Sequence, residues 1–208
     1  MKGKFITFEG CEGVGKSSQI RLLSQYLDRE KVNYCITREP GGEPVAEKIR
    51  NIILDGENVS MTDECEALLY AASRVQHLIK EVKPRLESGQ LVFCDRFIDS
   101  SFAYQGYARG LGYEFVAKIN DYAIKNFMPD YTVLLNLDPL AAFKRKGGVD
   151  KNDRVELSGE EFHAKVYKGY LDLAEKFPER FIVIDASGEK MQTHEKIITE
   201  LRRRSIIK

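Results

Sequence analysis

One stretch near the N-terminus constrains the fold more than any other. Residues 10–17 read Gly-Cys-Glu-Gly-Val-Gly-Lys-Ser and match the phosphate-binding pattern GxxxxGK followed by Ser or Thr. A short apolar run at 5–8 precedes them, and apolar residues recur at helical spacing in the stretch that follows. The pattern binds phosphate only as a turn between a strand and a helix, and that is its context here. A chance glycine-rich turn is the alternative, which the flanking segments count against.

Each residue type in this loop suits a bound nucleoside triphosphate. Glycines let the backbone curl so that its N–H groups face phosphate oxygens, and the following helix adds its N-terminal dipole. Lys16 supplies a positive charge between the β- and γ-phosphates, and the Ser17 hydroxyl suits the Mg²⁺ that accompanies ATP. The predicted ATP-binding residues are Gly10, Cys11, Glu12, Gly13, Val14, Gly15, Lys16, Ser17 and Ser18.

The rest of the chain predicts a parallel β-sheet. Continuous apolar runs alternate with longer helix-like stretches, which indicates crossover connections and strands buried on both faces. The predicted strands are 5–8, 34–37, 91–94, 131–137 and 181–184. We therefore predict an α/β fold, the three-layer P-loop NTPase fold, with a five-stranded parallel sheet flanked by helices and a small lid. A length of 208 residues suits a single domain over 1–208.

A long helix is predicted from Thr62 to Arg85. Its apolar residues recur at helical spacing and share one face, and Pro84 should bend or end it. These residues are Leu68, Ala72, Val75, Ile79 and Val82.

Composition excludes several classes of partner. Lys and Arg number 32 and Asp and Glu number 32, so the formal net charge is zero. This argues against non-specific binding to nucleic acid or to an anionic membrane. The longest apolar run, 67–72, is far shorter than a membrane span of about 20 residues, and the N-terminus lacks a secretory signal. We expect a cytoplasmic protein without a nucleic-acid or membrane partner.

Three carboxylates follow predicted strands, namely Asp95, Asp138 and Asp185. A P-loop enzyme needs one such aspartate near its metal ion. Asp95 is the best candidate because Arg96 follows it directly. For Asp138 and Asp185 we favour a turn or a helix cap.

A second group of residues falls near the same strand ends. It comprises Arg38, Arg50, Tyr70, Arg74 and the stretch 95–105. Arginine binds phosphate in a bidentate manner, aromatic rings stack on bases, and amides hydrogen-bond base edges. Together they predict a second nucleotide as phosphate acceptor, with the acceptor region at about 38–105. Taken singly, Arg38 and Arg50 would be surface ion pairs and Tyr70 a core residue.

With these motifs the chain resembles the bacterial thymidylate kinase family, one of the nucleoside-monophosphate kinases. The resemblance covers nearly the whole chain. It is carried by residues 8–17, by Thr-Arg-Glu-Pro-Gly-Gly at 37–42, by Leu-Tyr-Ala-Ala-Ser-Arg at 69–74 and by the stretch 95–105. The last is the most specific and reads Asp-Arg-Phe-Ile-Asp-Ser-Ser-Phe-Ala-Tyr-Gln.

The resemblance implies a role for each matching residue. Arg74 and Gln105 would hydrogen-bond the thymine edge, Tyr70 would stack on the ring, and Tyr104 would lie near the sugar. The remaining acceptor-binding residues would be Glu12, Arg38, Arg50, Arg96, Ser100 and Ser101. The predicted catalytic residues are Lys16, Asp95, Arg96, Arg145 and Arg154, with Ser17 and Asp95 at the Mg²⁺ ion. A homodimer is implied as well.

The family places a catalytic arginine either in the P-loop or in a lid over ATP. Gly13 stands at the P-loop position, so we expect the arginine to come from a lid within about 143–156. Arg145 and Arg154 are the two candidates, and the choice between them stays open.

The predicted reaction is transfer of a phosphoryl group from MgATP to dTMP, giving dTDP for dTTP synthesis. The alternatives are a kinase for another nucleoside monophosphate and a P-loop ATPase with a non-nucleotide partner. A GTP-dependent switch would need Asn-Lys-x-Asp, which does not occur. Residues 157–161 are faintly similar to a transporter-ATPase signature, but we interpret them as a capping box of Ser158 with Glu161.

Overall fold

Five parallel strands form the centre of the computed structural model, which describes residues 3–146 and 154–208. The strands are β1 (Phe5–Glu9), β2 (Tyr34–Arg38), β3 (Leu91–Asp95), β4 (Tyr131–Asn136) and β5 (Phe181–Asp185). Their order across the sheet is β2-β3-β1-β4-β5. The predicted α/β fold is confirmed, and each strand differs from its prediction only at its carboxyl end.

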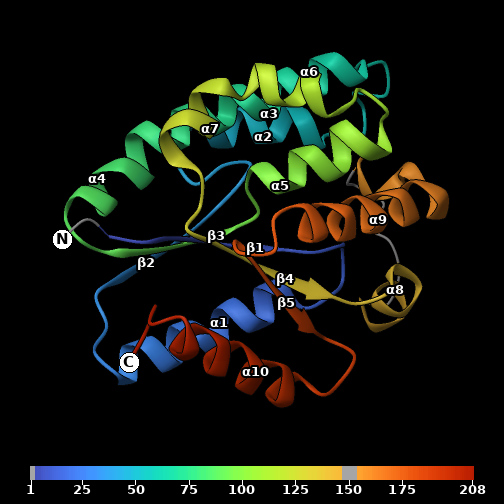
Figure 1. Cartoon of the computed structure of the whole chain (residues 1–208). Helices are drawn as coiled ribbons and strands as arrows, with labels where there is room; N and C mark the ends of the chain where they lie inside the picture. Colours follow the sequence, from blue (N-terminus) through green and yellow to red (C-terminus); the bar gives the residue numbers. More distant parts are fainter. Residues whose placement is uncertain (1–2, 147–153) are drawn as a thin grey trace.

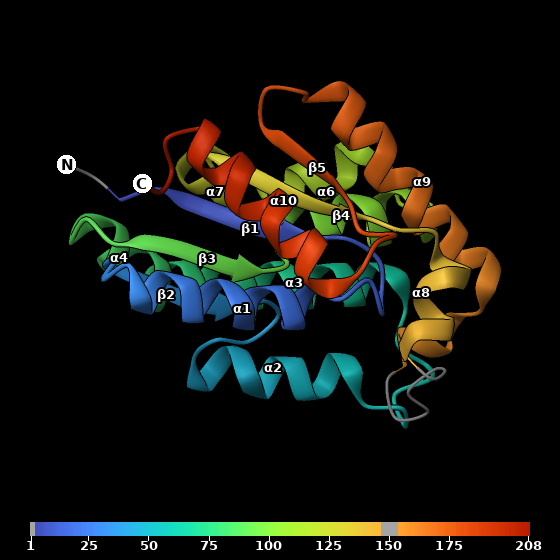
Figure 2. The same cartoon turned by 90° about the horizontal axis from the view of Figure 1, so that it is seen from below.

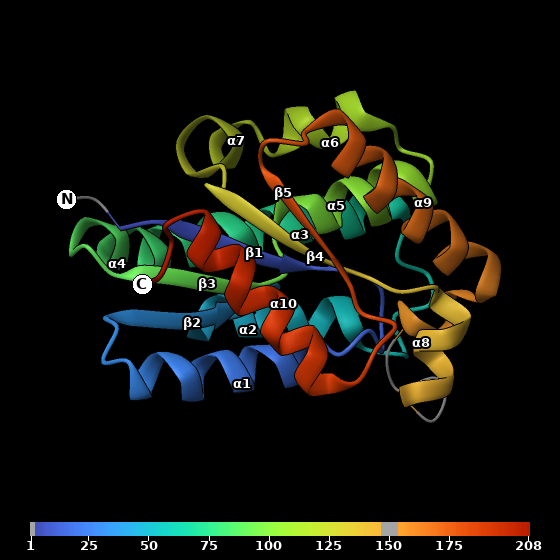
Figure 3. The ribbon, with the colours of Figure 1, turned by 60° about the horizontal axis from the view of Figure 1, so that its bottom comes forward.

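Helices cover both faces of the sheet (Figure 1). On one face α1 (Lys16–Arg29) and α10 (Lys190–Arg203) lie side by side, as Figure 3 shows most clearly. On the other lie α3 (Asp63–His77), α5 (Ile98–Ser101) and α9 (Glu160–Lys176). The other α-helices of the described residues are α2 (Pro44–Leu54), α4 (Lys83–Glu87), α6 (Tyr113–Ile119), α7 (Asp121–Phe127) and α8 (Pro139–Lys146), and a π-helical segment, η2 (Phe102–Ala108), follows α5. Figure 2 shows α8 beyond the carboxyl end of β4, next to α9.

The long helix predicted over 62–85 is present, but two of its features differ from the prediction. It runs from α3 through a π-helical turn, η1 (Leu78–Val82), into α4, so Pro84 does not end it. Pro84 lies in the first turn after the π-helical turn, where its missing N–H interrupts no regular α-helical bond.

Most of the predicted apolar face of this helix also points away from the core, although Val82 at its end is buried. Leu68 is 52% exposed, Val75 38% and Ile79 36%. The inward face instead carries polar side chains, Arg74 and His77 among them, which are almost completely buried. Periodicity therefore located the helix correctly, while a buried polar network decided its orientation.

Two predictions about helix ends have different outcomes. The capping box at Ser158 is wrong, because α9 begins at Glu160 after a glycine N-cap and Ser158 belongs to a 3₁₀ turn, η3 (Glu156–Ser158). The predicted roles of Asp138 and Asp185 are confirmed. Asp138 Oδ1 accepts hydrogen bonds from the N–H groups of Leu140 and Ala141, and Asp185 Oδ1 accepts one from Ser187.

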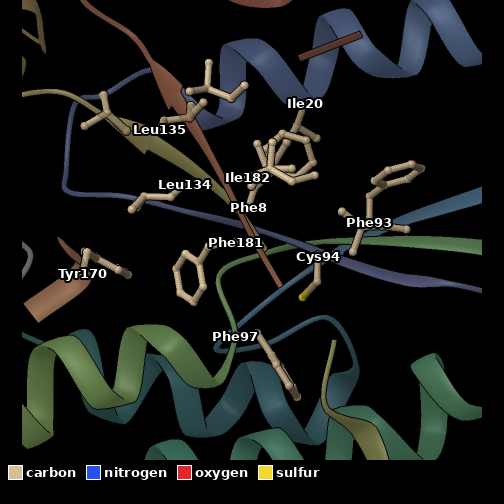
Figure 4. Close-up of a cluster of buried hydrophobic side chains, with 14 of the residues drawn as sticks. Phe8, Ile20, Phe93, Cys94, Phe97, Leu134, Leu135, Tyr170, Phe181 and Ile182 are labelled. Carbon is tan, nitrogen blue, oxygen red and sulfur yellow. The ribbon is translucent and has the colours of Figure 1, made fainter. Parts of the chain in front are cut away.

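Apolar side chains fill both interfaces between the sheet and its helices (Figure 4). Phe8 and Phe93 pack together with ring centroids 6.3 Å apart, on the side of α1 and its Ile20. On the other side the rings of Phe5 and Phe97 meet edge to face at 5.0 Å. Strands β1, β3 and β4 are buried as predicted, whereas the edge strands β2 and β5 are partly exposed. No helix of the described residues is both long and apolar enough for a membrane span.

Glu9 is the polar exception within this core, at the carboxyl end of β1. It is completely buried and accepts hydrogen bonds from the N–H and hydroxyl groups of Ser100, the N–H of Phe97 and the hydroxyl of Tyr170. Burial, together with the charge of Asp99, raises the pKa of Glu9 to about 7. One carboxyl group thus joins β1 to the segment after β3 and to α9.

This raised pKa makes folding stability depend on pH. In the unfolded chain Glu9 loses its proton near pH 4.5, but in the folded chain only near pH 7. The folded state therefore binds more protons between these values, and the free energy of unfolding falls as pH rises through them. We expect the wild type to lose about 2 to 3 kcal/mol more stability than Glu9→Gln between pH 5 and pH 8.

Urea denaturation of both proteins at several pH values measures this difference. The variant serves as the reference because other titrating groups are common to both proteins. Parallel curves for the two would contradict the prediction.

Candidate active site

A cleft of about 1460 Å³ opens at the carboxyl edge of the sheet. It is lined by segments that follow β1, β2, β3 and β5, which agrees with the rule that ligands bind outside the carboxyl ends of parallel strands. Of the predicted residues it contains Glu12, Gly13, Val14, Gly15, Lys16, Ser17, Ser18, Arg38, Arg50, Tyr70, Arg74, Asp95, Arg96, Ser100, Ser101, Tyr104, Gln105 and Arg145. Gly10, Cys11 and Arg154 are not part of its lining.

The shape of the loop after β1 depends on two glycines. Gly10 has a φ of 137°, and a Cβ atom there would lie 2.7 Å from the carbonyl oxygen of Leu135. Gly15 has a φ of 99° and is the N-cap of α1. Cys11, between them, is buried, and burial raises its pKa to about 12. The loop therefore presents backbone and the start of a helix to the cleft.

Lys16 stabilises this loop from within. Its Nζ donates to the carbonyl oxygens of Gly10 and Cys11, each at 2.9 Å. Burial lowers the pKa of Lys16. The ammonium group is thus held at the centre of the loop, where the phosphates of a nucleotide would lie.

Arg96 joins the loop to the segment after β3. Its φ of 66° is in the left-handed region, which is unusual for a residue other than glycine, and its N–H donates to Phe8. The guanidinium group donates to the carbonyl of Gly10 at 3.0 Å and to Tyr170 at 3.1 Å, and it forms an ion pair with Glu12. Arg96 therefore lies between the predicted donor and acceptor sites with its orientation fixed.

The side chain of Asp95 is suited to the role of a metal ligand. Its Oδ1 atom is buried, and among the described residues no hydrogen-bond donor reaches it. Asp95 lines the same cleft as Ser17, the other predicted metal ligand. A buried carboxylate oxygen without a donor is costly unless a cation binds it, so its chemistry suits Mg²⁺.

The arginines after β2 lie at the mouth of the cleft. Arg38 Nη2 donates to both carboxylate oxygens of Glu47, at 2.8 and 2.9 Å, and its side chain is 45% exposed. Arg50 donates to the carbonyl oxygen of Pro40 at 3.0 Å. Arg38 does form the surface ion pair considered from the sequence, yet both residues also line the cleft.

Arg74 is held far more tightly. Only 2% of it is exposed, and it donates to Glu39 at 2.8 Å, to Asn120 at 2.6 Å and to the carbonyl oxygen of Phe97 at 3.2 Å. Glu39 also bonds with His77 Nδ1 at 2.9 Å. These contacts hold the guanidinium group of Arg74 rigidly at the wall of the cleft.

The segment over 100–105 brings the other predicted acceptor residues into the cleft. Tyr104 donates to Glu12 at 3.5 Å, and Gln105 donates from Nε2 to Glu66 at 2.8 Å. Ser100 bonds with Glu9, and the Ser101 hydroxyl has no hydrogen-bond partner within the described part of the chain.

The structure separates the two candidate lid arginines. Arg145, near the end of α8, donates to the carbonyl oxygens of Ala186, at 2.6 Å, and Ser187, beside the P-loop side of the cleft. Arg154 donates to the carbonyl oxygen of Ile53 at 3.1 Å and pairs with Glu66 on α3. The rest of the predicted lid, 147–153, lies outside the described residues.

Sequence reasoning missed several residues that hold the site together. They are Glu9, Glu39, Glu66, Arg109, Asn120 and Tyr170. All except Arg109 contact a predicted site residue from a distant part of the chain, and Arg109 contacts Glu66. Glu9 and Glu39 do lie within the stretches that carry the family resemblance, which was the available signal; Tyr170 and Asn120 had none.

Comparison with known proteins agrees with this architecture. The family model described as thymidylate kinase matches residues 8–197. The thymidylate kinase of Caldanaerobacter subterraneus is 48% identical over 198 residues, which cover 95% of this chain and 94% of the relative. That of Symbiobacterium thermophilum is 50% identical over 183 residues, covering 88% and 85%.

A solved structure gives the same result. The crystal structure of thymidylate kinase from Ehrlichia chaffeensis matches with a TM-score of 0.79 and 33% identity, covering 97% of this chain and 100% of that one. The chain belongs to the thymidylate kinase family.

Proposed function

We propose that this protein transfers the γ-phosphoryl group of ATP to dTMP, giving ADP and dTDP, as a step in dTTP synthesis. One observation carries this proposal: a single cleft is lined both by a P-loop and by a second set of arginines and base-binding side chains. An ATPase with a non-nucleotide partner would not need the second set. Membership of the thymidylate kinase family favours dTMP over other nucleoside monophosphates.

Catalysis rests on alignment and on neutralisation of charge. The acceptor phosphate is already anionic, so the reaction needs no strong general base. Lys16 and the loop around it hold the donor phosphates. Arg96, which contacts the P-loop carbonyl of Gly10 and the hydroxyl of Ser100, stabilises the transferring phosphoryl group from between the two sites.

Ser17 and Asp95 would hold Mg²⁺ in this scheme. The unpartnered Oδ1 atom of Asp95 supports the assignment. Within the described residues no group of three or more His, Cys, Asp or Glu side chains is arranged for metal binding, so phosphate oxygens and water would complete the shell. Bound Mg²⁺ supplies positive charge to the β- and γ-phosphate oxygens.

The acceptor nucleotide would lie along the other side of the cleft. Arg38 and Arg50, at its mouth, suit the acceptor phosphate, with Glu12 and Ser100 close by. Tyr70 suits stacking on thymine, and the buried Arg74 and Gln105 suit hydrogen bonds to its edge. The ring of Tyr104, 5.2 Å from the guanidinium carbon of Arg96, would lie near the sugar, and Ser101 near the base.

Of the two lid arginines, Arg145 is the one that supports a role at the donor phosphates, because it lines the cleft. Arg154 is paired with Glu66 instead, and its catalytic role stays a prediction. The cytoplasmic location also stays a prediction of the sequence. A single catalytic domain over 1–208 is supported by the continuous hydrophobic core.

We further propose that the protein forms a homodimer. The outward stripe of Leu68 and Val75 on α3 and Ile79 on η1 supports it, because adjacent exposed apolar residues on one continuous helix suit burial against a second copy of the chain.

The dimer prediction is tested with Val75→Glu. A buried carboxylate would oppose association, so we expect light scattering to give about twice 23.8 kDa for the wild type and about 23.8 kDa for the variant. Val59→Glu, at a position 82% exposed, is the matched control and should leave the mass unchanged. A monomeric wild type would end this part of the proposal.

The proposed reaction is tested by ADP release from MgATP with dTMP, dUMP, UMP, CMP, AMP and GMP offered separately, with a blank lacking acceptor. We expect strong release with dTMP, weaker release with dUMP and release near the blank with the others. Excess EDTA should abolish the release. Preference for another monophosphate would overturn the base assignment, and equal release in all reactions would indicate an ATPase.

The role of Arg96 is tested with Arg96→Ala. Alanine has a Cβ atom as arginine does, so backbone strain at the left-handed position is unchanged while the guanidinium group is lost. We expect kcat to fall by about 100-fold or more while the protein stays folded. Arg85→Ala, a change to a partly exposed helix residue, is the control. Near-normal turnover in a folded Arg96→Ala protein would contradict the role.

A further inference from the structure

Glu66 is a buried carboxylate that the mechanism above does not use. It lies on the inward face of α3 with none of its surface exposed. Three side chains donate to it: Gln105 Nε2 at 2.8 Å, Arg154 Nη2 at 2.5 Å and Arg109 Nη2 at 3.2 Å. One of these, Gln105, is a wall residue of the proposed base site.

Glu66 is ionised at neutral pH. Burial acts to raise the pKa of its carboxyl group, but the charge of Arg109 and the hydrogen bonds from Gln105 and Arg154 outweigh burial, so that the pKa is lower than its usual value. Arg109 is itself fixed by Asp63 at 3.3 Å and by the ring of Phe162, 4.5 Å from its guanidinium carbon. An ionised carboxylate can only accept hydrogen bonds.

Because Glu66 can only accept hydrogen bonds, it determines which end of the Gln105 side-chain amide faces it. A glutamine amide has a donor end and an acceptor end that are nearly equal in shape, so shape alone does not decide which end points where. Against Glu66 only the NH₂ end is favourable, because the Oε1 end would place two acceptors in contact. The acceptor end of Gln105 is therefore directed away from Glu66.

We propose that Glu66 is a positioning residue that fixes the Gln105 amide with its oxygen toward the acceptor base and thereby selects bases that carry an N3–H group. The inference rests on the proposed function, since it concerns the base site of the same cleft. Thymine and uracil offer N3–H as a donor, whereas cytosine offers a bare N3 as an acceptor. An oxygen held toward N3 attracts the first two and repels the third.

The fixed donors of Arg74 complement this arrangement. Thymine presents the O4 acceptor beside N3–H, and cytosine presents an NH₂ donor there. Arg74, whose guanidinium group is held by Glu39, Asn120 and Phe97, can only donate. Glu39 and Glu66 thus act alike, each holding one base-binding side chain from behind.

The test is Glu66→Gln, measured with dTMP, dUMP and dCMP. The new amide can donate to or accept from Gln105, so both orientations of Gln105 become acceptable. We expect the ratio of kcat/KM for dTMP over dCMP to fall about tenfold or more, mainly through KM for the nucleoside monophosphate. The ratio for dTMP over dUMP should stay unchanged, because both bases carry N3–H. If the substitution only loosened the packing of the base site, both ratios would change together or both would stay unchanged.

Two control variants separate orientation from stability. Glu66→Asp retains a group that only accepts, so it should keep the discrimination against dCMP even if its thermal midpoint falls. Asp63→Asn removes the charge of another partner of Arg109 that does not contact Gln105, and it should leave both ratios unchanged. An unaltered ratio for dTMP over dCMP in a folded Glu66→Gln protein would overturn the inference.

A measurement on the wild type keeps the inference testable should Glu66→Gln fail to fold. In protein labelled with ¹⁵N-glutamine, the Nε2–H signal of Gln105, assigned with Gln105→Leu, should be protected from exchange with solvent before any ligand is added. An unprotected signal would overturn the inference. Failure of the proposed function is distinguishable, because a wild type inactive on dTMP would fail before any ratio is taken.

Discussion

Pairing of arginine with carboxylate is the interaction on which the rest of this site depends. A cleft for two phosphate-bearing nucleotides needs several guanidinium groups, and each must be kept in place without a ligand. Arg96 is paired with Glu12, Arg74 with Glu39 and Arg38 with Glu47. The pairs differ in exposure, from almost none at Arg74 to nearly half at Arg38.

Because the pairs differ in burial, they differ in the free energy that is needed to break them. The exposed pair at the mouth can be rearranged at small cost, because solvent screens both charges. The buried pair of Arg74 and Glu39 is costly to break, because either partner alone would be an uncompensated charge. Rearranging Arg38 at the mouth of the cleft therefore costs little free energy, whereas displacing Arg74 at the inner wall costs much more.

Local patterns in the sequence predicted the sheet and the location of the site. The strands were found because their apolar runs are continuous, and the P-loop because its glycines and lysine have a fixed spacing. The rule for parallel sheets then placed Asp95, Arg38 and Arg96 at one edge, where the structure has them. The inward face of α3 could not be predicted in this way. Its partners, Glu39 and Gln105, are 35 and 39 residues away from Arg74 and Glu66, and single-sequence periodicity carries no information on such contacts.

The left-handed backbone conformation of Arg96 affects how a substitution at this position would change the stability of the protein. A side chain in that conformation costs about 1 to 2 kcal/mol, which glycine would not incur. The contacts of the guanidinium group with Gly10, Glu12 and Tyr170 offset this cost. A glycine at this position would relieve the backbone but would remove the side chain that joins the loop after β1 to the end of β3 and to α9.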